Sequence, residues 1–218
     1  MAVHAVAFDL DDTLVATDRD RQTLLDEATD AAGVRDITRQ EYLDAHGADL
    51  ASETRAPIFD AILDGGDAEA ASRAYRDAVN EALVPVPGVP DLLAGLRERY
   101  CVGLLTDGPS RAQRSKLERL GWADLFDTVV VTGELPAGKP DPRAFAALTD
   151  RLGVPPEETV YVGDNPTADI HGAKQARMLA VQVLSTTEGE PDPAADATVV
   201  HGTLVEDIRS VLSRQQRL

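Results

Sequence analysis

The chain has 218 residues, 43% of them hydrophobic, which is enough to bury a substantial core. It carries 38 acidic and 21 basic residues, and the resulting formal net charge of -17 repels polyanions and argues against a nucleic-acid-binding surface. No apolar run reaches membrane-spanning length and no secretory signal is recognisable, so we expect a cytoplasmic protein that does not associate with membranes.

Lysine is rare in this chain, because it occurs only at positions 116, 139 and 174 while arginine supplies the other basic residues. A dense carboxylate surface with few lysines is typical of proteins that stay soluble at high salt, where self-repulsion is screened. The composition therefore predicts a halophilic protein. Cys101 is the single cysteine, which excludes an internal disulfide.

The first predicted strand, residues 3–8, is followed at once by acidic residues. Alternate residues that leave a strand can point the same way, so Asp9 and Asp11 are expected to face one cleft. Two neighbouring carboxylates favour a hard divalent cation such as Mg²⁺. A solvated acidic turn would show the same pattern.

Residues 17–84 show only helical patterns, among them Thr38 and Glu41 at the spacing of a capping box. A proline-rich connection at 84–90 precedes a predicted helix at 91–99. This organisation predicts a helical cap at 17–84, inserted into an α/β core made of residues 1–16 and 85–218. Candidates for substrate contacts in the cap are Arg19, Arg21, Arg55, Tyr42 and Phe59, although helix surface or cap core is the simpler interpretation of each.

The second predicted strand, residues 100–105, ends at Thr106 and Asp107, just before a predicted helix at 110–120. A hydroxyl group and the free N–H groups of a helix start are suited to phosphate oxygens. An ordinary helix cap with a glycine turn is the alternative interpretation.

Two further strands end in residues of complementary chemistry. The run at 128–132 leads to Lys139 in a proline-flanked loop, where its ammonium group can neutralise a phosphoryl group. The run at 159–162 leads to Asp164, which could coordinate metal directly, and then to Asp169, which could orient Asp164 or Lys139.

The remaining elements complete a regular alternation. A helix is predicted at 142–152, strands at 179–184 and 197–200, a loop at 188–196, and a closing helix near Thr203 and Glu206, which have capping-box spacing. Strands that alternate with helices predict an α/β fold with a Rossmann-like parallel sheet and a helical cap inserted after the first strand. Ligands bind at the carboxyl ends of such strands, so the polar groups are expected to share one site.

In order and spacing these groups resemble the four motifs of the haloacid dehalogenase superfamily, over nearly the whole chain, and the insertion is similar to the small helical cap of its phosphatase branch. The resemblance implies a nucleophile, Asp9, that forms an aspartyl-phosphate, and an acid/base partner, Asp11. It implies that Asp9, the backbone carbonyl of Asp11 and Asp164 bind Mg²⁺. It also implies that Asp169 and Thr13 support these ligands. It implies phosphoryl contacts from Thr106, Asp107 and Lys139.

The expected substrate is a small phosphorylated metabolite, either phosphoglycolate-like or nucleotide-like. Dehalogenases of this branch generally lack the second aspartate, so Asp11 favours a phosphatase over a 2-haloacid dehalogenase. A phosphonate hydrolase would need a cap lysine, and none lies between residues 17 and 84. A phosphomutase, or a non-catalytic module that binds metal or a partner protein in the acidic cleft, stays an alternative.

Overall fold

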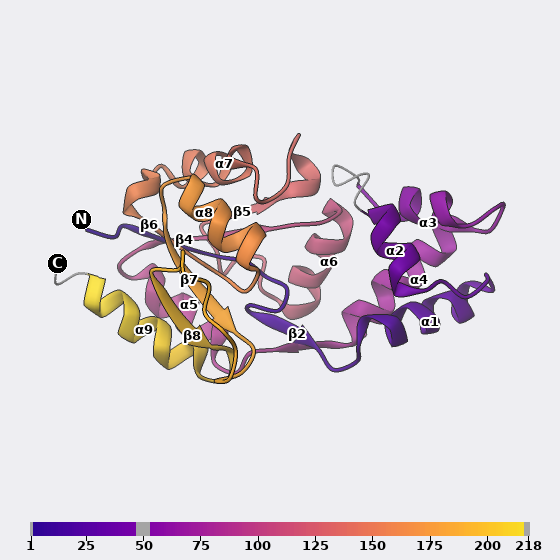
Figure 1. The fold of residues 1–218 in the computed structure, drawn as a ribbon, viewed down its shortest axis with the longest axis horizontal. Coiled ribbons are helices and arrows are strands. Elements are labelled where there is room, and N and C mark those ends of the chain that lie inside the picture. Colours follow the sequence, from indigo (N-terminus) through magenta and orange to yellow (C-terminus); the bar gives the residue numbers. More distant parts are fainter. Residues whose placement is uncertain (1, 47–52, 216–218) are drawn as a thin grey trace.

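The computed structural model describes residues 2–46 and 53–215, which form two groups of elements side by side (Figure 1). The larger group contains a six-stranded sheet in which all the neighbouring strands pair in parallel. The strands, in sheet order, are β5 (Thr128–Val131), β4 (Cys101–Thr106), β1 (Ala5–Phe8), β6 (Thr159–Gly163), β7 (Leu179–Leu184) and β8 (Ala197–Val200). The predicted Rossmann-like α/β fold is confirmed.

Helices cover both faces of this sheet, which explains why its strands are apolar on consecutive residues. Val6 and Phe8 join one hydrophobic cluster, whereas Ala7 joins the cluster on the opposite face. The helices of the first face are α5 (Val89–Arg97), α6 (Ser110–Leu120) and α9 (Leu204–Gln215). Those of the second face are α7 (Pro142–Leu152), the π-helical turn η3 (Pro166–His171) and α8 (Gly172–Gln175).

Most bounds agree closely with the prediction: the helices at 110–120 and 142–152 and the strands at 179–184 and 197–200 match at both ends. Helix α5 begins two residues earlier than predicted, because Pro90 occupies its first turn, where proline is tolerated. At the closing helix, Thr203 Oγ1 donates to Asp207 Oδ2 at 2.6 Å, so Glu206 is not its partner.

The second group consists of four helices with a hydrophobic cluster of their own, called the four-helix group below. Its members are α1 (Arg21–Ala32), α2 (Arg39–His46), α3 (Ala56–Ile62) and α4 (Ala68–Glu81). The predicted capping box begins α2, since Thr38 N donates to Glu41 Oε2 at 2.8 Å and Glu41 N donates to Thr38 Oγ1 at 3.2 Å. None of the helices in the described ranges combines the length and apolar character needed to cross a membrane.

A short antiparallel ribbon connects the two groups, made of β2 (Val15–Thr17) and β3 (Leu83–Pro85). The sequence predicted no strand here, because each strand has only three residues and Pro85 indicated a stiff connection. Proline lacks the N–H group that donates hydrogen bonds between strands, so it is tolerated at the end of a strand, where such a bond is not needed. The predicted division of the chain at residues 17 and 84 falls inside this ribbon and stays a prediction.

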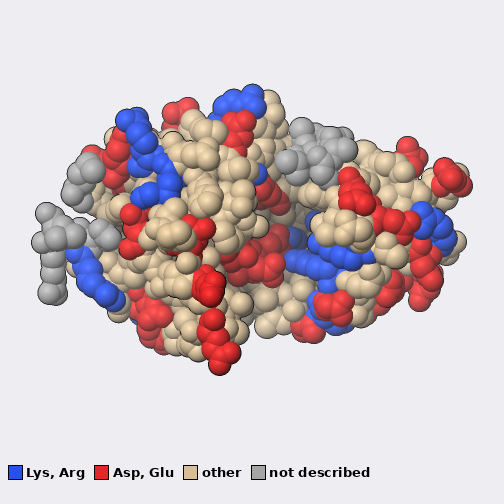
Figure 2. Space-filling view, in the orientation of Figure 1, with Lys and Arg blue, Asp and Glu red and all other residues tan. Residues whose placement is uncertain are grey.

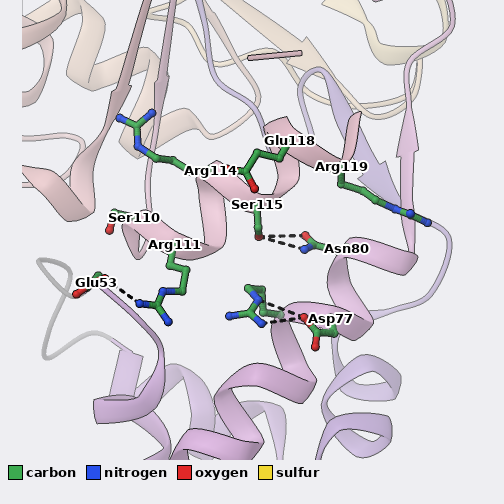
Figure 3. A pocket seen from close by; sticks show the side chains of 10 residues that line it. Glu53, Asp77, Asn80, Ser110, Arg111, Arg114, Ser115, Glu118 and Arg119 are labelled. Atoms are coloured by element: carbon green, nitrogen blue, oxygen red, sulfur yellow. Dashed lines mark hydrogen bonds and ion pairs between the residues drawn. The ribbon is translucent and has the colours of Figure 1, made fainter. Parts of the chain in front are cut away.

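Charge is distributed unevenly over the face of the molecule shown in Figure 2. Acidic side chains are scattered widely, whereas a basic patch of the four-helix group faces an acidic area of the sheet-containing core across a hollow (Figure 2). The groups also meet where α4 approaches α6, since Asn80 Nδ2 donates to Ser115 Oγ at 3.1 Å (Figure 3). At the hollow seen in Figure 2, the two groups therefore present side chains of opposite charge to each other.

Candidate active site

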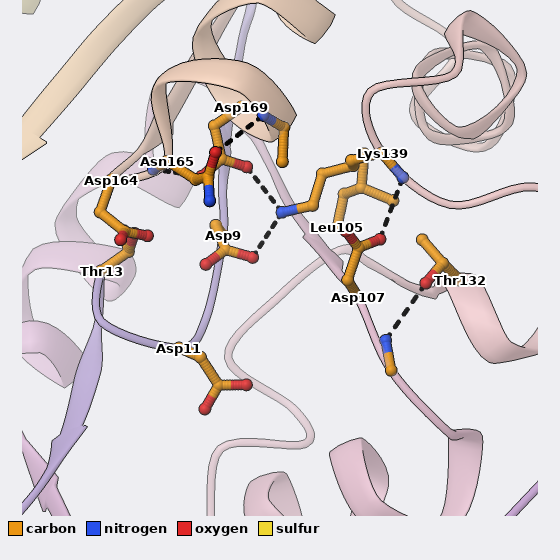
Figure 4. A network of polar contacts seen from close by, with 12 residues as sticks. Asp9, Asp11, Thr13, Leu105, Asp107, Thr132, Lys139, Asp164, Asn165 and Asp169 are labelled. Atoms are coloured by element: carbon orange, nitrogen blue, oxygen red, sulfur yellow. Dashed lines mark hydrogen bonds and ion pairs between the residues drawn. The ribbon is translucent and has the colours of Figure 1, made fainter. Parts of the chain in front are cut away.

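The candidate site lies at the carboxyl ends of β1, β4 and β6 (Figure 4). Strands β1 and β6 are neighbours, and the chain continues from β1 toward β4 on one side of the sheet but from β6 toward β7 on the other. Ligands of such sheets bind at this switch point. A cavity of 190 Å³ opens there, called the phosphate cavity below. Its lining residues are Asp9, Asp11, Asp12, Thr106, Asp107, Lys139, Asp164, Asn165, Ala168 and Asp169.

A buried lysine lies at the centre of this cavity. Lys139 Nζ donates to Asp9 Oδ1 at 2.7 Å and to Asp169 Oδ1 at 2.6 Å (Figure 4). Burial lowers the pKa of Lys139, but Asp9, Tyr161, Asp169 and Asp107 together outweigh burial and hold this pKa well above its usual range. Burial raises the pKa of Asp9 well above its usual range, although Lys139 opposes this effect.

Asp169 and Tyr161 hold Lys139 in place. Asn165 N donates to Asp169 Oδ2 at 2.9 Å, and Tyr161 OH lies 3.2 Å from Lys139 Nζ. A side chain at Gly163 would put its Cβ 2.4 Å from Asp169 Cγ, so only glycine leaves room for this carboxylate. These contacts agree with the expectation that Asp169 lies beside Lys139 and can orient it. The functional role of Asp169 stays a prediction.

Thr106 and Asp107 leave β4 with different partners. The Thr106 hydroxyl is buried and has no hydrogen-bond partner among the described residues, so it is available to a ligand in the phosphate cavity. The Asp107 carboxylate accepts a hydrogen bond of 3.1 Å from Lys139 N and thus ties the two loops together. Of the two residues, Thr106 has the geometry expected of a phosphate ligand.

Three carboxylates lie close enough to hold one metal ion. Oxygen atoms of Asp9, Asp164 and Asp169 lie within 4.8 Å of one another, and Thr13 Oγ1 donates to Asp164 Oδ1 at 3.2 Å. Burial, with repulsion from Asp169, raises the pKa of Asp164 to about 6. Crowded carboxylate oxygens are the ligands that Mg²⁺ prefers, and a cation would relieve their repulsion, so the donor set fits this metal.

Asp11 points away from the other carboxylates of the site (Figure 4). Lys116 Nζ lies 2.6 Å and 2.5 Å from its two carboxylate oxygens, and Gln113 Nε2 donates to it at 3.0 Å. Burial raises the pKa of Asp11, but Lys116 and then Arg21 outweigh burial, so that the pKa is lowered to about 2. In this conformation Asp11 is an anion bound to a buried lysine.

The sequence interpretation assigned no role to Gln113 or Lys116. The available signals were the rarity of lysine and the spacing of three residues, which puts both side chains on one face of α6. The pairing of Lys116 with Asp11 spans 105 positions and follows from the fold alone.

A second cavity of 200 Å³, called the cap cavity below, adjoins the first and extends to the four-helix group. Its lining residues are Asp11, Asp12, Arg21, Arg39, Tyr42, Leu43, His46, Arg55, Tyr75, Asp107, Gly108, Gln113 and Lys116. Arg19 is not among them, because it pairs with Asp18 and Glu27. Phe59 is fully buried in the core of the four-helix group.

Comparisons with known proteins identify the family of the chain. The model of the haloacid dehalogenase-like hydrolase family matches residues 3–177. The chain is 35% identical to the glyceraldehyde 3-phosphate phosphatase of Methanopyrus kandleri, over 90% of this chain and 91% of that protein. It is 37% identical to the phosphoserine phosphatase of Thermus thermophilus, over 70% of this chain and 63% of that protein.

The solved structures give the same result. The structure of a phosphatase of this superfamily from Thermococcus onnurineus superimposes with a TM-score of 0.74 at 28% identity and covers 96% of this chain and 98% of that chain. The family match, the full-length relative and the shared fold confirm the resemblance found in the sequence. The chain belongs to the haloacid dehalogenase-like hydrolase family.

Proposed function

We propose that the protein is a Mg²⁺-dependent phosphatase that hydrolyses a small phosphomonoester through an aspartyl-phosphate on Asp9. Membership of the family and the phosphatase relatives support the class of phosphoric monoester hydrolases. The observation that carries the proposal is the phosphate cavity, where the Asp9 carboxylate, the Lys139 ammonium and the unpartnered Thr106 hydroxyl lie together.

The chain's own side chains supply the parts that phosphoryl transfer needs. One Asp9 oxygen is held by Lys139, which leaves the other oxygen to attack phosphorus. A bond forms between this oxygen and phosphorus while the bond from phosphorus to the ester oxygen breaks; water then attacks phosphorus and releases phosphate and free Asp9. Lys139 and Thr106 bind phosphoryl oxygens, where charge must be stabilised in the transition state.

Asp9 and Asp164, with the backbone carbonyl of Asp11, would hold Mg²⁺. The ion, when bound, supplies positive charge for the phosphoryl oxygens. Thr13 orients Asp164 through its hydrogen bond, and Asp169 supports the site by fixing Lys139.

Asp11 is the proposed acid/base group, and its present partner bears on that role. An anion held by Lys116 can accept a proton from water but cannot donate one to a leaving group. In the reacting conformation the Asp11 side chain must therefore leave Lys116, take up a proton from solvent and turn toward Asp9. It gives this proton to the leaving ester oxygen and takes one back from the attacking water. The four-helix group acts as a cap in this proposal, because Arg21 of α1 reaches within 3.8 Å of Asp11 Oδ1.

Turnover of p-nitrophenyl phosphate tests the proposal. Wild-type protein should release phosphate with Mg²⁺, lose activity in EDTA and regain it with excess Mg²⁺. Asp9→Asn should abolish turnover, whereas Asp150→Asn, which removes an exposed carboxylate of α7, should retain it. Near-normal turnover by Asp9→Asn would contradict the covalent mechanism, and full activity in EDTA would contradict the metal requirement.

A further inference from the structure

The cap cavity gathers four Arg and Lys side chains, and the proposed chemistry involves two of them, Arg21 and Lys116, which lie beside Asp11. Arg21 begins α1, Arg39 begins α2 and Arg55 precedes α3, so three separate segments of the four-helix group each contribute one guanidinium group. Lys116 adds a fourth cation from the core side.

Two of these arginines lack a carboxylate partner in the described part of the chain. Arg39 and Arg55 make no ion pair within 4.0 Å there; their guanidinium carbons lie 5.3 Å from the centre of the Tyr42 ring and 5.5 Å from that of Tyr75, respectively. The Nε atom of Arg55 is buried and has no hydrogen-bond partner. A buried donor without an acceptor is costly, so this geometry favours an acceptor from a ligand.

The larger cavity between α4 and α6 provides a contrast (Figure 3). It has a volume of 620 Å³ and four arginines in its lining. Three of these are already neutralised, because Arg76, Arg111 and Arg114 pair with nearby carboxylates at 3.1, 3.0 and 2.6 Å. Arg39 and Arg55 of the cap cavity differ from these three, because neither has a carboxylate within 4.0 Å in the described part of the chain.

We propose that the cap cavity binds a carboxylate of the substrate, so that the enzyme acts on small phosphorylated carboxylic acids; this inference rests on the proposed phosphatase function. The planar guanidinium groups of Arg39 and Arg55 match the two oxygens of a carboxylate. The cap cavity shares Asp11, Asp12 and Asp107 with the phosphate cavity, so one molecule can occupy both.

The size of the cap cavity limits the rest of the substrate. A volume of 200 Å³ accommodates roughly six or seven non-hydrogen atoms, at about 30 Å³ for each water-sized group. A chain of two to four carbon atoms with one carboxylate fits this space, whereas a nucleoside exceeds it. The inference therefore takes the phosphoglycolate-like substrate of the two considered from the sequence, and the nucleotide-like substrate stays the alternative.

The test compares two substrates that differ in one group. 3-Phosphoglycerate carries a carboxylate where glycerol 3-phosphate has a neutral CH₂OH group. Wild-type enzyme should have a kcat/KM at least tenfold higher for 3-phosphoglycerate. Arg39→Gln and Arg55→Gln should each reduce this preference by roughly 10- to 100-fold, because each removes a charge-assisted hydrogen bond.

Arg73→Gln is the matched control, since it removes one positive charge from an exposed position of α4 and should leave the preference unchanged. Equal kcat/KM values for the two substrates in the wild type would overturn the inference while the phosphatase function stands. Failure to hydrolyse p-nitrophenyl phosphate and both metabolites would instead contradict the proposed function. If Arg55→Gln does not fold, the test rests on Arg39→Gln. An unchanged preference of this variant for 3-phosphoglycerate over glycerol 3-phosphate would overturn the inference.

Discussion

Replacing Lys116 with methionine should destabilise the protein strongly, because Lys116 neutralises a carboxylate that is mostly buried. The Lys116 side chain is 2% exposed and that of Asp11 is 25% exposed, so water compensates little for the lost pair. Methionine has nearly the same length as lysine and fills the same space, so the substitution tests the charge rather than the packing. Asp11 would keep only Gln113 at 3.0 Å and Arg21 at 3.8 Å.

The expected magnitude follows from the pKa of Asp11. Its decrease from 3.8 to about 2 corresponds to about 2 kcal/mol of folded-state stability at neutral pH. This stability is present above pH 4, where the unfolded carboxyl is ionised, and is lost as the pH falls toward 2. Without Lys116, burial should raise the pKa of Asp11, so Lys116→Met should lose about 2 to 3 kcal/mol at pH 7.

Urea unfolding in EDTA at pH 7, and at several values between pH 4 and pH 2, measures both effects without bound metal. Lys174→Met is the matched control, because Lys174 is 35% exposed and pairs with Asp196 at 2.7 Å near the surface. Exposed pairs contribute about 0 to 1 kcal/mol. An equal loss of stability in the two variants, or an unchanged slope of stability with pH below 4 in Lys116→Met, would refute the reasoning.

Three further outcomes are expected. Because burial raises the pKa of Asp164 to about 6, protonation should compete with metal, and the Mg²⁺ concentration for half-maximal activity should rise roughly tenfold from pH 7 to pH 5; an unchanged value would contradict its role as a ligand. Gly163→Ala should lower the free energy of unfolding in urea by about 1 to 3 kcal/mol and remove most of the activity, because the new Cβ atom would lie 2.4 Å from Asp169 Cγ. Gly95→Ala is the control and should be tolerated, because its Cβ atom would have no neighbour within 4 Å. Molar KCl should raise the thermal unfolding midpoint by screening a net charge of -17, and the same midpoint with and without KCl would contradict the halophilic interpretation.

The sheet could be predicted from the sequence because its strands are short apolar runs between well-marked helix ends. Gly121 and Gly153 end α6 and α7 in the left-handed conformation, which glycine adopts readily after the last turn of a helix. The meeting of Asp9, Lys139 and Asp164 could also be anticipated, since parallel strands bring their carboxyl ends to one edge. Apolar runs, helix ends and the rule that parallel strands end at one edge were therefore sufficient to predict the sheet and the meeting of these three residues.

The contacts of Asp11 and the cap cavity could not be predicted in the same way. The partner of Asp11 lies on α6, and the three cap arginines come from separate segments, so no local spacing relates them. The β2–β3 ribbon was missed because three-residue strands carry almost no periodicity. The Asp11–Lys116 pair depends on how α6 packs against the sheet, and the cap cavity depends on how the four-helix group sits against the core.

The ribbon has a consequence for how such a chain can diversify. Thr17 pairs with Leu83 and Val15 with Pro85, so the chain leaves the core and returns to it at neighbouring points. The intervening segment is one continuous stretch of the gene, whereas Asp9, Thr106, Lys139 and Asp164 are encoded outside it. Recombination at the two ribbon strands would therefore exchange the whole four-helix group, with the arginines proposed to select the substrate, and leave every proposed phosphoryl-transfer residue in place.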